Sequence, residues 1–166
     1  GMGFVPEDRK LQGLVLGMSV GKNTTLAALK AVANKAGFIN HKQEKDMADK
    51  FVKALEVKTP SNDQLVKNLS GGNQQKVVIA KWLANNPDIL ILDEPTRGID
   101  VGAKKEIHQL MSDLANQGVA IIMISSELPE VLGMSDRVVV MHEGCIKGEL
   151  NRAEADQVSI MKMAVS

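Results

Sequence analysis

Aromatic side chains are scarce in this sequence of 166 residues, which contains three Phe, one Trp and no Tyr. Proteins that bind single-stranded nucleic acids stack bases on aromatic rings, and this chain offers little for that purpose. Basic charge is not in excess either, because 20 Lys and Arg are balanced by 20 Asp and Glu. A chain without net positive charge gains little electrostatic binding energy from a nucleic-acid phosphate backbone, so we expect no nucleic acid among its partners.

Cysteine and long hydrophobic runs are equally rare. The single cysteine, Cys145, cannot form an internal disulfide, which suits a reducing compartment, and we expect it to lie in the core. The longest continuous apolar run covers residues 119–124, whereas about 18 consecutive apolar residues are needed to cross a bilayer. The apolar fraction of 44% is ordinary for a globular protein, so the sequence predicts a packed domain without a membrane span.

Short, continuous apolar runs are what the sequence does contain. They occupy residues 89–92, 119–124 and 138–141, and a helical spacing of apolar residues over 107–114 separates the first two. Continuous rather than alternating apolar residues are typical of parallel strands that are covered on both faces. The sequence therefore predicts an α/β fold with a parallel sheet and crossover helices, followed by an antiparallel strand over 145–150.

Helix signals dominate the residues before this sheet. Ser19 is suited to cap a helix that the apolar spacing extends as far as Gly37. A second helix carries an apolar stripe over 47–55, and a third follows a serine and two glycines at 70–72. Residues 19–84 are therefore expected to form a helical block.

Two acids, Asp93 and Glu94, follow the apolar run of 89–92. Ligands of open parallel sheets bind outside the carboxyl ends of the strands, which is where this pair is expected. One carboxylate there can hold Mg²⁺ through its waters. Its neighbour, which points elsewhere because strand side chains alternate, can orient a water toward a phosphate. The alternative is that the pair only caps a helix or closes a turn.

The triplet Ser70-Gly71-Gly72 stands at the start of the third helix. Such a start offers unpaired backbone N–H groups, the positive end of a helix dipole and a small hydroxyl, all of which suit phosphate oxygens. Taken alone, the triplet is better explained as an N-cap beside a glycine-rich turn, and its context favours the phosphate interpretation.

Together these segments resemble a known family. Three segments in succession resemble the signature, Walker B and D-loop series of the ABC transporter ATPases. They are Leu69-Ser70-Gly71-Gly72-Asn73-Gln74-Gln75-Lys76, then the strand with its two acids, then Pro95-Thr96-Arg97-Gly98-Ile99-Asp100. Further stretches, at 6–10, 101–104 and 125–127, are similar to the second nucleotide-binding domain of bacterial sugar importers of the ribose type. The resemblance covers nearly the whole chain.

This resemblance implies a partial P-loop NTPase-like fold, in which an α/β parallel-sheet core carries an inserted helical subdomain. Residues 1–166 would form a single truncated nucleotide-binding domain. Within it, 19–84 would be the helical subdomain with the signature motif, and 1–18 and 87–166 the remnant of the catalytic core.

The resemblance also implies roles for individual residues. Asp93 would bind Mg²⁺, and Glu94 would polarise the attacking water in catalysis. The cofactors would be ATP and Mg²⁺, and the nucleotide contacts would come from Ser70, Gly71, Gly72, Asn73, Gln74, Asp100, Glu7 and Ser126. Glu7 stands where most ABC ATPases have a glutamine, and Ser126 where they have a switch histidine, which leaves open that one of the two composite ATP sites is degenerate.

A P-loop of the form G-x-x-x-x-G-K-[ST] is missing from the sequence. Residues 17–23 look similar, but the spacing is one residue too short and Asn23 stands where the hydroxyl residue should be, so we interpret them as a helix start. The chain alone is therefore expected to be inactive, whereas the intact subunit is expected to hydrolyse ATP.

The implied partners are the first nucleotide-binding domain of the same subunit, the membrane permease subunits and, indirectly, a periplasmic sugar-binding protein. They would place the chain on the cytoplasmic face of the bacterial inner membrane. Strand edges left unpaired by the missing P-loop strand predict that the isolated chain self-associates. An alternative function is a noncatalytic, regulatory half that transmits motion to the membrane subunit, which the missing P-loop, Glu7 and Ser126 favour.

Overall fold

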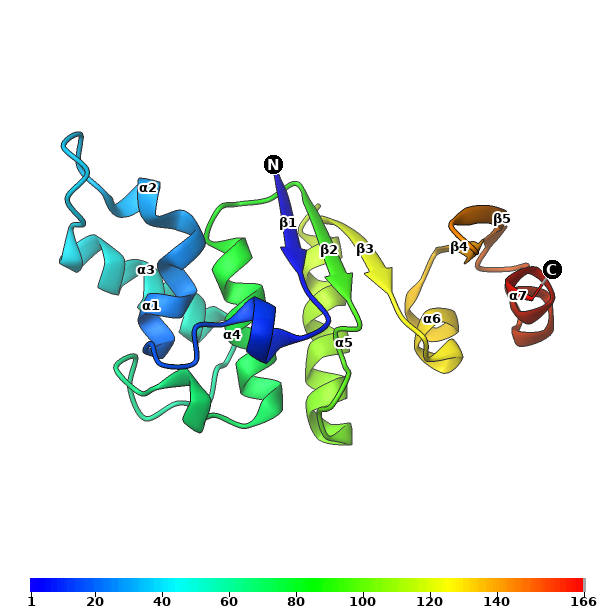
Figure 1. Cartoon of the computed structure of the whole chain (residues 1–166), viewed down its shortest axis with the longest axis horizontal. Coiled ribbons are helices and arrows are strands. Elements are labelled where there is room, and N and C mark those ends of the chain that lie inside the picture. The colour runs from blue at the N-terminus through cyan, green and yellow to red at the C-terminus, as the bar shows by residue number, and fades with distance from the viewer. Residues whose placement is uncertain (166) are drawn as a thin grey trace. The chain divides into compact units, whose positions relative to one another are not determined.

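The computed structural model describes residues 1–165 and contains two compact units, residues 1–124 and the residues from Ser125 onward. The first unit holds a sheet and a helical block, and the second holds a β-hairpin with two helices (Figure 1). The expectation of one truncated domain over 1–166 stays a prediction, and its last residue lies outside the described part of the chain.

A parallel sheet of three strands lies at the centre of the first unit. Its members, in the spatial order β1-β2-β3, are β1 (Met2–Val5), β2 (Ile89–Asp93) and β3 (Ala120–Ile124). The helix α5 (Val101–Asn116) joins β2 to β3 as a crossover. The predicted α/β class, the parallel pairing and the crossover helix are confirmed.

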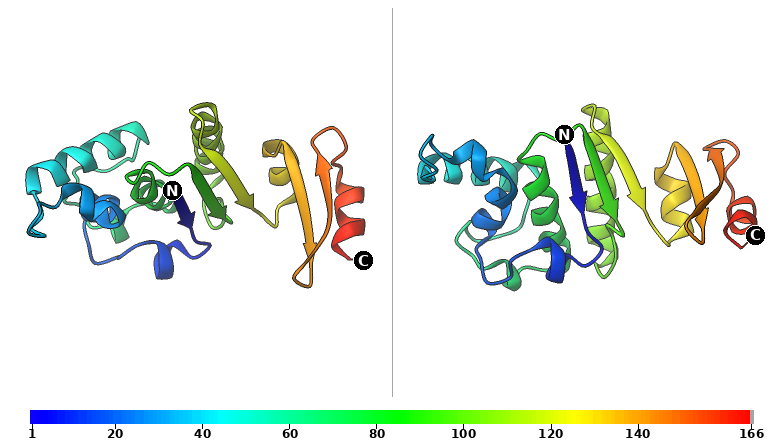
Figure 2. Two further views of the ribbon diagram at one scale, coloured as in Figure 1. Left: turned by 90° about the horizontal axis from the view of Figure 1, so that it is seen from above. Right: turned by 45° about the horizontal axis from the view of Figure 1, so that its top comes forward.

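Two helices cover one face of this sheet. α4 (Gly71–Leu83) and α5 lie on the same side of the strands (Figure 2), and Leu90 and Leu92 are buried on that side. The opposite face, which we call the open sheet face, carries half-exposed apolar side chains, namely Phe4 (44%), Ile122 (50%) and Ile124 (49%). Within the first unit the expectation of strands covered on both faces is therefore wrong. A continuous apolar run shows that both faces are apolar, and it does not show that both have a partner in the same chain.

The helical block lies on one flank of the first unit. Ser19 Oγ accepts the N–H of Lys22, so the predicted N-cap is confirmed. The elements up to α4 are a π-helical turn (Arg9–Gly13), α1 (Val20–Thr25), a 3-10 turn (Leu26–Ala28), α2 (Leu29–Val32), α3 (His41–Ala54) and a second 3-10 turn (Val66–Asn68).

The first helix of this block is shorter than its apolar spacing predicts. In place of one helix reaching Gly37, α1 passes through a 3-10 turn into α2, and α2 ends at Val32. Asn34 then redirects the chain, because its Oδ1 accepts the N–H groups of Ala36 and Phe38, each at 3.0 Å. An asparagine side chain that bonds to nearby backbone in this way competes with the helix, and the hydrophobic spacing carries no information about that competition.

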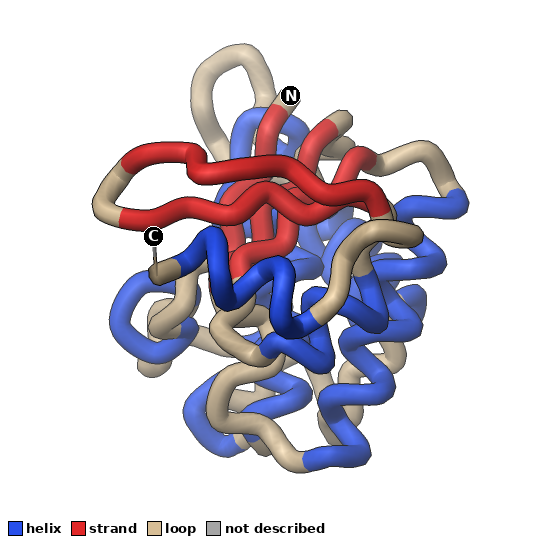
Figure 3. The backbone as a smooth tube through the Cα atoms, turned by 90° about the vertical axis from the view of Figure 1, so that its right-hand side faces the viewer, coloured by secondary structure: helices blue, strands red, loops and turns tan. Residues whose placement is uncertain are grey.

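The second unit is a β-hairpin with packed helices (Figure 3). Its elements are α6 (Leu128–Met134), β4 (Arg137–His142), β5 (Cys145–Asn151) and α7 (Gln157–Ala164). Val138, Val140 and Ile160 are buried together where α7 packs on β4. The antiparallel pairing of β4 with β5, predicted from the sequence, is confirmed.

Two expectations for this unit are wrong. The run of 138–141 was expected to join the parallel sheet, but within the described chain it pairs only with β5. The turn residues Glu143 and Gly144 both have left-handed φ values, 48° and 77°, which favour a tight hairpin with the neighbouring strand. Cys145, expected in the core, is exposed at the start of β5. None of the helices described in residues 1–165 has the length and apolar character that a bilayer crossing requires.

Candidate functional site

The predicted acids lie at the carboxyl end of β2, next to β3. Asp93 is the last residue of β2, and both Asp93 and Glu94 are half-buried. Glu94 has a left-handed φ of 46°. Its N–H donates to the carbonyl of Ile124 at 2.9 Å, and its own carbonyl accepts the N–H of Arg97 at 3.1 Å. The neighbouring strand and a tight turn thus fix the backbone from which the two carboxylates project.

Asp93 meets the requirements of a Mg²⁺ ligand that acts together with a substrate. Its carboxylate makes no side-chain hydrogen bond or ion pair within residues 1–165. In the same part of the chain no three His, Cys, Asp or Glu residues gather into a metal-binding group. Mg²⁺ commonly binds through one or two carboxylates and completes its shell with water and substrate phosphates. The residues present therefore fit a hydrated Mg²⁺ that arrives with a phosphate, and they do not fit an ion caged by protein alone.

The start of α4 presents an exposed hydroxyl and free helix amides. Ser70 is exposed and occupies the N-cap position, but its side chain accepts no backbone N–H of the helix. Asn73 holds this hydroxyl, since its Nδ2 donates to Ser70 Oγ at 2.9 Å while its Oδ1 accepts the N–H of Lys58 at 2.8 Å. Helix-start amides that no cap satisfies are suited to bind an anion.

Gln74, the next residue of the predicted set, has different surroundings. It is buried, and its Nε2 donates to the carbonyl of Val66 at 3.2 Å. Its Oε1 is buried without a hydrogen-bond partner. The nucleotide contact expected of Gln74 stays a prediction, and in this structure its side chain supports the loop before α4.

The start of α5 packs directly against the start of α4. Asp100 caps α5, because its Oδ1 accepts the N–H of Ala103 at 2.9 Å. A Cβ placed on Gly72 would lie 2.5 Å from the Cβ of Ala103, which leaves no room for a side chain. The structure therefore brings Ser70, Gly71, Gly72 and Asp100 together with the loop that follows the acids.

The last two predicted residues follow the other two strands of the sheet, Glu7 after β1 and Ser126 after β3. Glu7 is exposed after β1, and its carboxylate forms an ion pair with Arg97. Ser126 is exposed in the second unit, beside Ser125, whose Oγ donates to Glu130 Oε2 at 2.5 Å. The roles of both residues stay predictions. Sequence reasoning missed Arg97 and Arg9 as members of this region, although both belong to the motifs that carried the resemblance.

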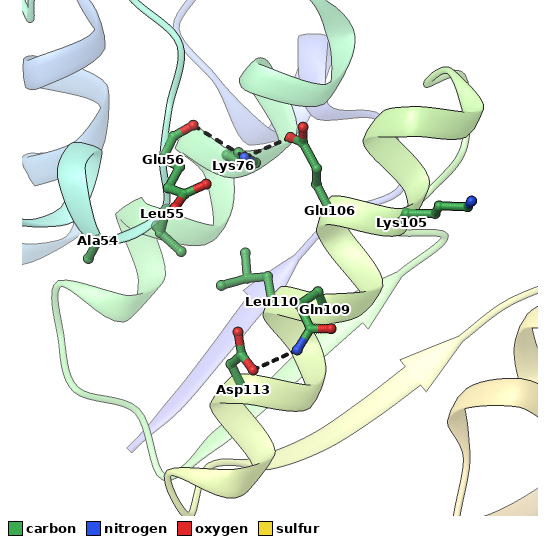
Figure 4. Close-up of a pocket in the computed structure, with 9 residues that line it drawn as sticks. All are labelled: Ala54, Leu55, Glu56, Lys76, Lys105, Glu106, Gln109, Leu110 and Asp113. Carbon is green, nitrogen blue, oxygen red and sulfur yellow. Dashed lines mark hydrogen bonds and ion pairs between the residues drawn. The ribbon is translucent and has the colours of Figure 1, made fainter.

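A groove of about 460 Å³ lies elsewhere in the first unit, between the end of α3, α4 and α5 (Figure 4). The Lys76 side chain at its base is only 5% exposed and lies 2.9 Å from Glu106 Oε2. Hydrogen bonds from Lys76 and Lys58 lower the pKa of the Glu106 carboxyl. None of the predicted site residues lines the groove, so we interpret this ion pair as a tie between α4 and α5.

The family described as ABC transporter matches residues 1–97. The chain is 59% identical over 165 residues to a ribose import ATP-binding protein of Clostridium perfringens, covering 99% of this chain and 33% of that protein. It is 60% identical to a ribose/galactose/methyl galactoside import ATP-binding protein of Rhizobium etli, of which it covers 31%. The chain thus spans about a third of the length of these relatives.

Solved structures give the same similarity at the level of the fold. A dimeric ATP-binding cassette in a post-hydrolysis state, bound to ADP and Pi, superposes with a TM-score of 0.75 at 25% identity, over 91% of this chain and 62% of that one. An inward-facing ABC transporter of the metal-chelate type superposes with a TM-score of 0.83 at 18% identity, over 99% of this chain and 63% of that one.

Proposed function

Because the chain belongs to the ABC transporter family, we propose that it supplies part of the ATP-hydrolysing machinery of a bacterial sugar importer. Its fold is a partial P-loop NTPase-like α/β core with an inserted helical subdomain. One observation carries the proposal: the loop between the strand-end acids and α5 lies against the serine-glycine start of α4. The loop that follows the acids therefore links two elements that each suit phosphate chemistry and that are separated in the sequence.

Glu94 is the catalytic residue of this proposal. Its backbone is held by Ile124 and Arg97, so its carboxylate is positioned before substrate arrives. It accepts a proton from, or orients, the water that attacks the terminal phosphate. Asp93 binds Mg²⁺, which neutralises phosphate charge when it is bound.

The start of α4 acts on a different phosphate. The amides of Gly71 and Gly72 and the hydroxyl of Ser70 bind the γ-phosphate of ATP held by the opposing domain, with the helix dipole adding to the attraction. Asn73 keeps the Ser70 hydroxyl in place through a 2.9 Å hydrogen bond. The chain thus takes part in two composite ATP sites, one through its acids and one through its signature helix.

The partners follow from the same proposal. The chain works with the first nucleotide-binding domain of its subunit and with membrane permease subunits on the cytoplasmic face of the inner membrane, and a periplasmic sugar-binding protein delivers the sugar to them. The names of the relatives, which specify ribose or galactose import, support a sugar of this size as the cargo. The helical block of 19–84 is the part proposed to contact the permease.

A second candidate function is a noncatalytic half that transmits motion. Glu7 supports it, because this carboxylate stands at the glutamine position and is engaged by Arg97. The serine at position 126 supports it as well. Both functions share the same fold and partners, and they differ in whether Glu94 is needed for turnover.

ATP hydrolysis by a two-domain protein tests the proposal. We define the chimeric subunit as the Clostridium perfringens ribose import ATP-binding protein in which this chain replaces the matching third. The chimeric subunit is expected to hydrolyse Mg²⁺-ATP, whereas this chain alone is expected to be silent because it has no P-loop. Turnover by the chain alone would contradict the second expectation. A folded chimeric subunit that binds ATP without turnover, beside an active unmodified relative, would favour the noncatalytic function.

Self-association of the isolated chain is a second expectation. In the described residues β3 pairs with β2 on one edge only, and Ile122 and Ile124 lie half-exposed on the open sheet face. Unpaired strand edges and apolar sheet faces promote association. Size-exclusion chromatography with light scattering should give a mass above that of one chain, and Ile122→Lys should lower it. Val158→Lys, which changes an exposed apolar residue of α7, should not. A monodisperse monomer would refute the expectation.

A further inference from the structure

Arg9 connects two segments that are far apart in the sequence. It starts the π-helical turn after β1, and its guanidinium reaches the loop after β2. Nη1 donates to the carbonyl of Arg97 at 2.7 Å, and Nη2 donates to the carbonyl of Gly98 at 3.0 Å. One planar fork thus holds two consecutive carbonyls, which a lysine ammonium cannot match because it is a single point of charge.

A third segment meets the same guanidinium. A Cβ on Gly71 would lie 2.9 Å from Arg9 Nη2 and 3.2 Å from the carbonyl oxygen of Gly98. Gly98 has a φ of 66°, which glycine adopts without strain and which allows the loop to turn at this point. The turn after β1, the loop of 95–100 and the start of α4 therefore converge on Arg9.

The contacts between the first two segments are reciprocal. Arg9 holds the backbone at 97 and 98, while the Arg97 guanidinium forms an ion pair with the Glu7 carboxylate. We call these contacts the arginine clasp. Burial lowers the pKa of Arg9, and nearby Asp8 raises it, yet a guanidinium stays charged at any physiological pH. Its Nε is buried without a hydrogen-bond partner, a cost that a side chain directed into solvent would avoid.

Further along, α4 and α5 are held together without Arg9. Gly72 lies against Ala103 at the first turn, and Lys76 pairs with Glu106 one turn later (Figure 4). These two contacts hold the first turns of the helices together. The loop that leads from Glu94 into α5 contacts the start of α4 directly at Gly71, through the Gly98 carbonyl and Ile99, and Arg9 adds two hydrogen bonds to this loop.

We propose that Arg9 is a positioning residue that sets the Ser70-Gly71-Gly72 start of α4 relative to the loop carrying Glu94. The inference rests on the proposed function, since it assigns Arg9 a part in ATP turnover. Arg9 acts through Gly98 and Gly71 and contacts no group assigned to Mg²⁺ or to the attacking water. Its loss should slow the chemical step while leaving the affinity for ATP nearly unchanged, because small displacements of reacting groups cost rate more than binding.

Steady-state kinetics of the chimeric subunit tests whether Arg9 affects ATP turnover. Arg9→Lys keeps the positive charge but lacks the planar guanidinium, and Arg9→Met keeps only the aliphatic part of the side chain. Both are expected to lower kcat by about tenfold with KM for ATP changed by less than about twofold. Arg137→Lys, which alters an exposed ion pair in the β4–β5 hairpin, is the matched control and should change neither constant. An unchanged kcat in both Arg9 variants, or a raised KM at unchanged kcat, overturns the inference.

Hydrogen exchange of the isolated chain tests the structural side without any need for turnover. In Arg9→Lys the Arg97 amide, which donates to the Glu94 carbonyl, should exchange about tenfold faster, while the amides of α3 keep their wild-type rates. Unchanged exchange at Arg97 overturns the inference. If the wild-type chimeric subunit does not hydrolyse ATP, the proposed function fails on its own, and the exchange result still decides whether the clasp holds this loop.

Discussion

Glu94→Gln in the chimeric subunit is expected to lower kcat for ATP hydrolysis by at least about a hundredfold, which is the usual contribution of a positioned general base. The substitution keeps the size of the side chain and its hydrogen-bonding reach, but it removes the charge that orients or deprotonates water. Binding of ATP should persist, because Mg²⁺ and phosphate contacts are assigned to Asp93 and to helix amides. Phosphate release with a parallel nucleotide-binding measurement separates the two effects.

The chain offers a closely matched control for this substitution. Glu143→Gln makes the same chemical change at a residue with nearly the same left-handed backbone, φ 48° against 46° for Glu94, and it lies exposed in the β4–β5 turn. Its kcat should equal that of the wild type. If Glu94→Gln also retains full turnover, Glu94 is not catalytic, and the noncatalytic function becomes the better account of this chain.

Gly72→Ala is expected to destabilise the isolated chain by about 1–3 kcal/mol, the usual cost of forcing extra volume into a packed contact. The added Cβ would lie 2.5 Å from the Cβ of Ala103 and 3.7 Å from its Cα, so the starts of α4 and α5 must separate. In an exposed helix the same change would be stabilising, because alanine has the better helix propensity. Urea denaturation followed by circular dichroism measures the difference in the free energy of unfolding.

A compensating substitution distinguishes this clash from a general effect of altering α4. In the double variant Gly72→Ala with Ala103→Gly, the methyl group moves from α5 to α4 and the overlap disappears. The double variant should recover most of the lost stability, which gives a favourable coupling energy in the double-mutant cycle. Additive losses from the two single changes would show that the close approach of the helices does not limit stability.

The local signals in this sequence proved the most reliable. Ser19 caps the first helix as predicted, because its side chain accepts an N–H only three residues away. The apolar runs at 89–92 and 119–124 became neighbouring parallel strands. Because Asp93 and Glu94 directly follow one of these strands, their place at its carboxyl end followed from the sequence alone.

The errors arose where a distant or competing contact decides the structure. Asn34 ended the first helix through hydrogen bonds that the hydrophobic spacing does not reveal. The run of 138–141 paired with its neighbour in the chain rather than with the parallel sheet, since a tight turn brings β5 beside it. Apolar residues on the open sheet face are not covered within the first unit. Hydrophobicity indicates that a side chain favours burial, but it does not indicate which segment buries it.

The sequence by itself determined the α/β class, the family resemblance and the residue types at the strand end and the helix start. These depend on short-range patterns of apolar spacing, capping and motif order. Only the tertiary structure decided that Arg9 donates hydrogen bonds to the carbonyls of Arg97 and Gly98, which lie 88 and 89 residues away. It also decided that Gly72 has no room for a side chain. Such contacts exist only after the sheet has brought its first two strands together, so no local pattern can encode which residues will meet there.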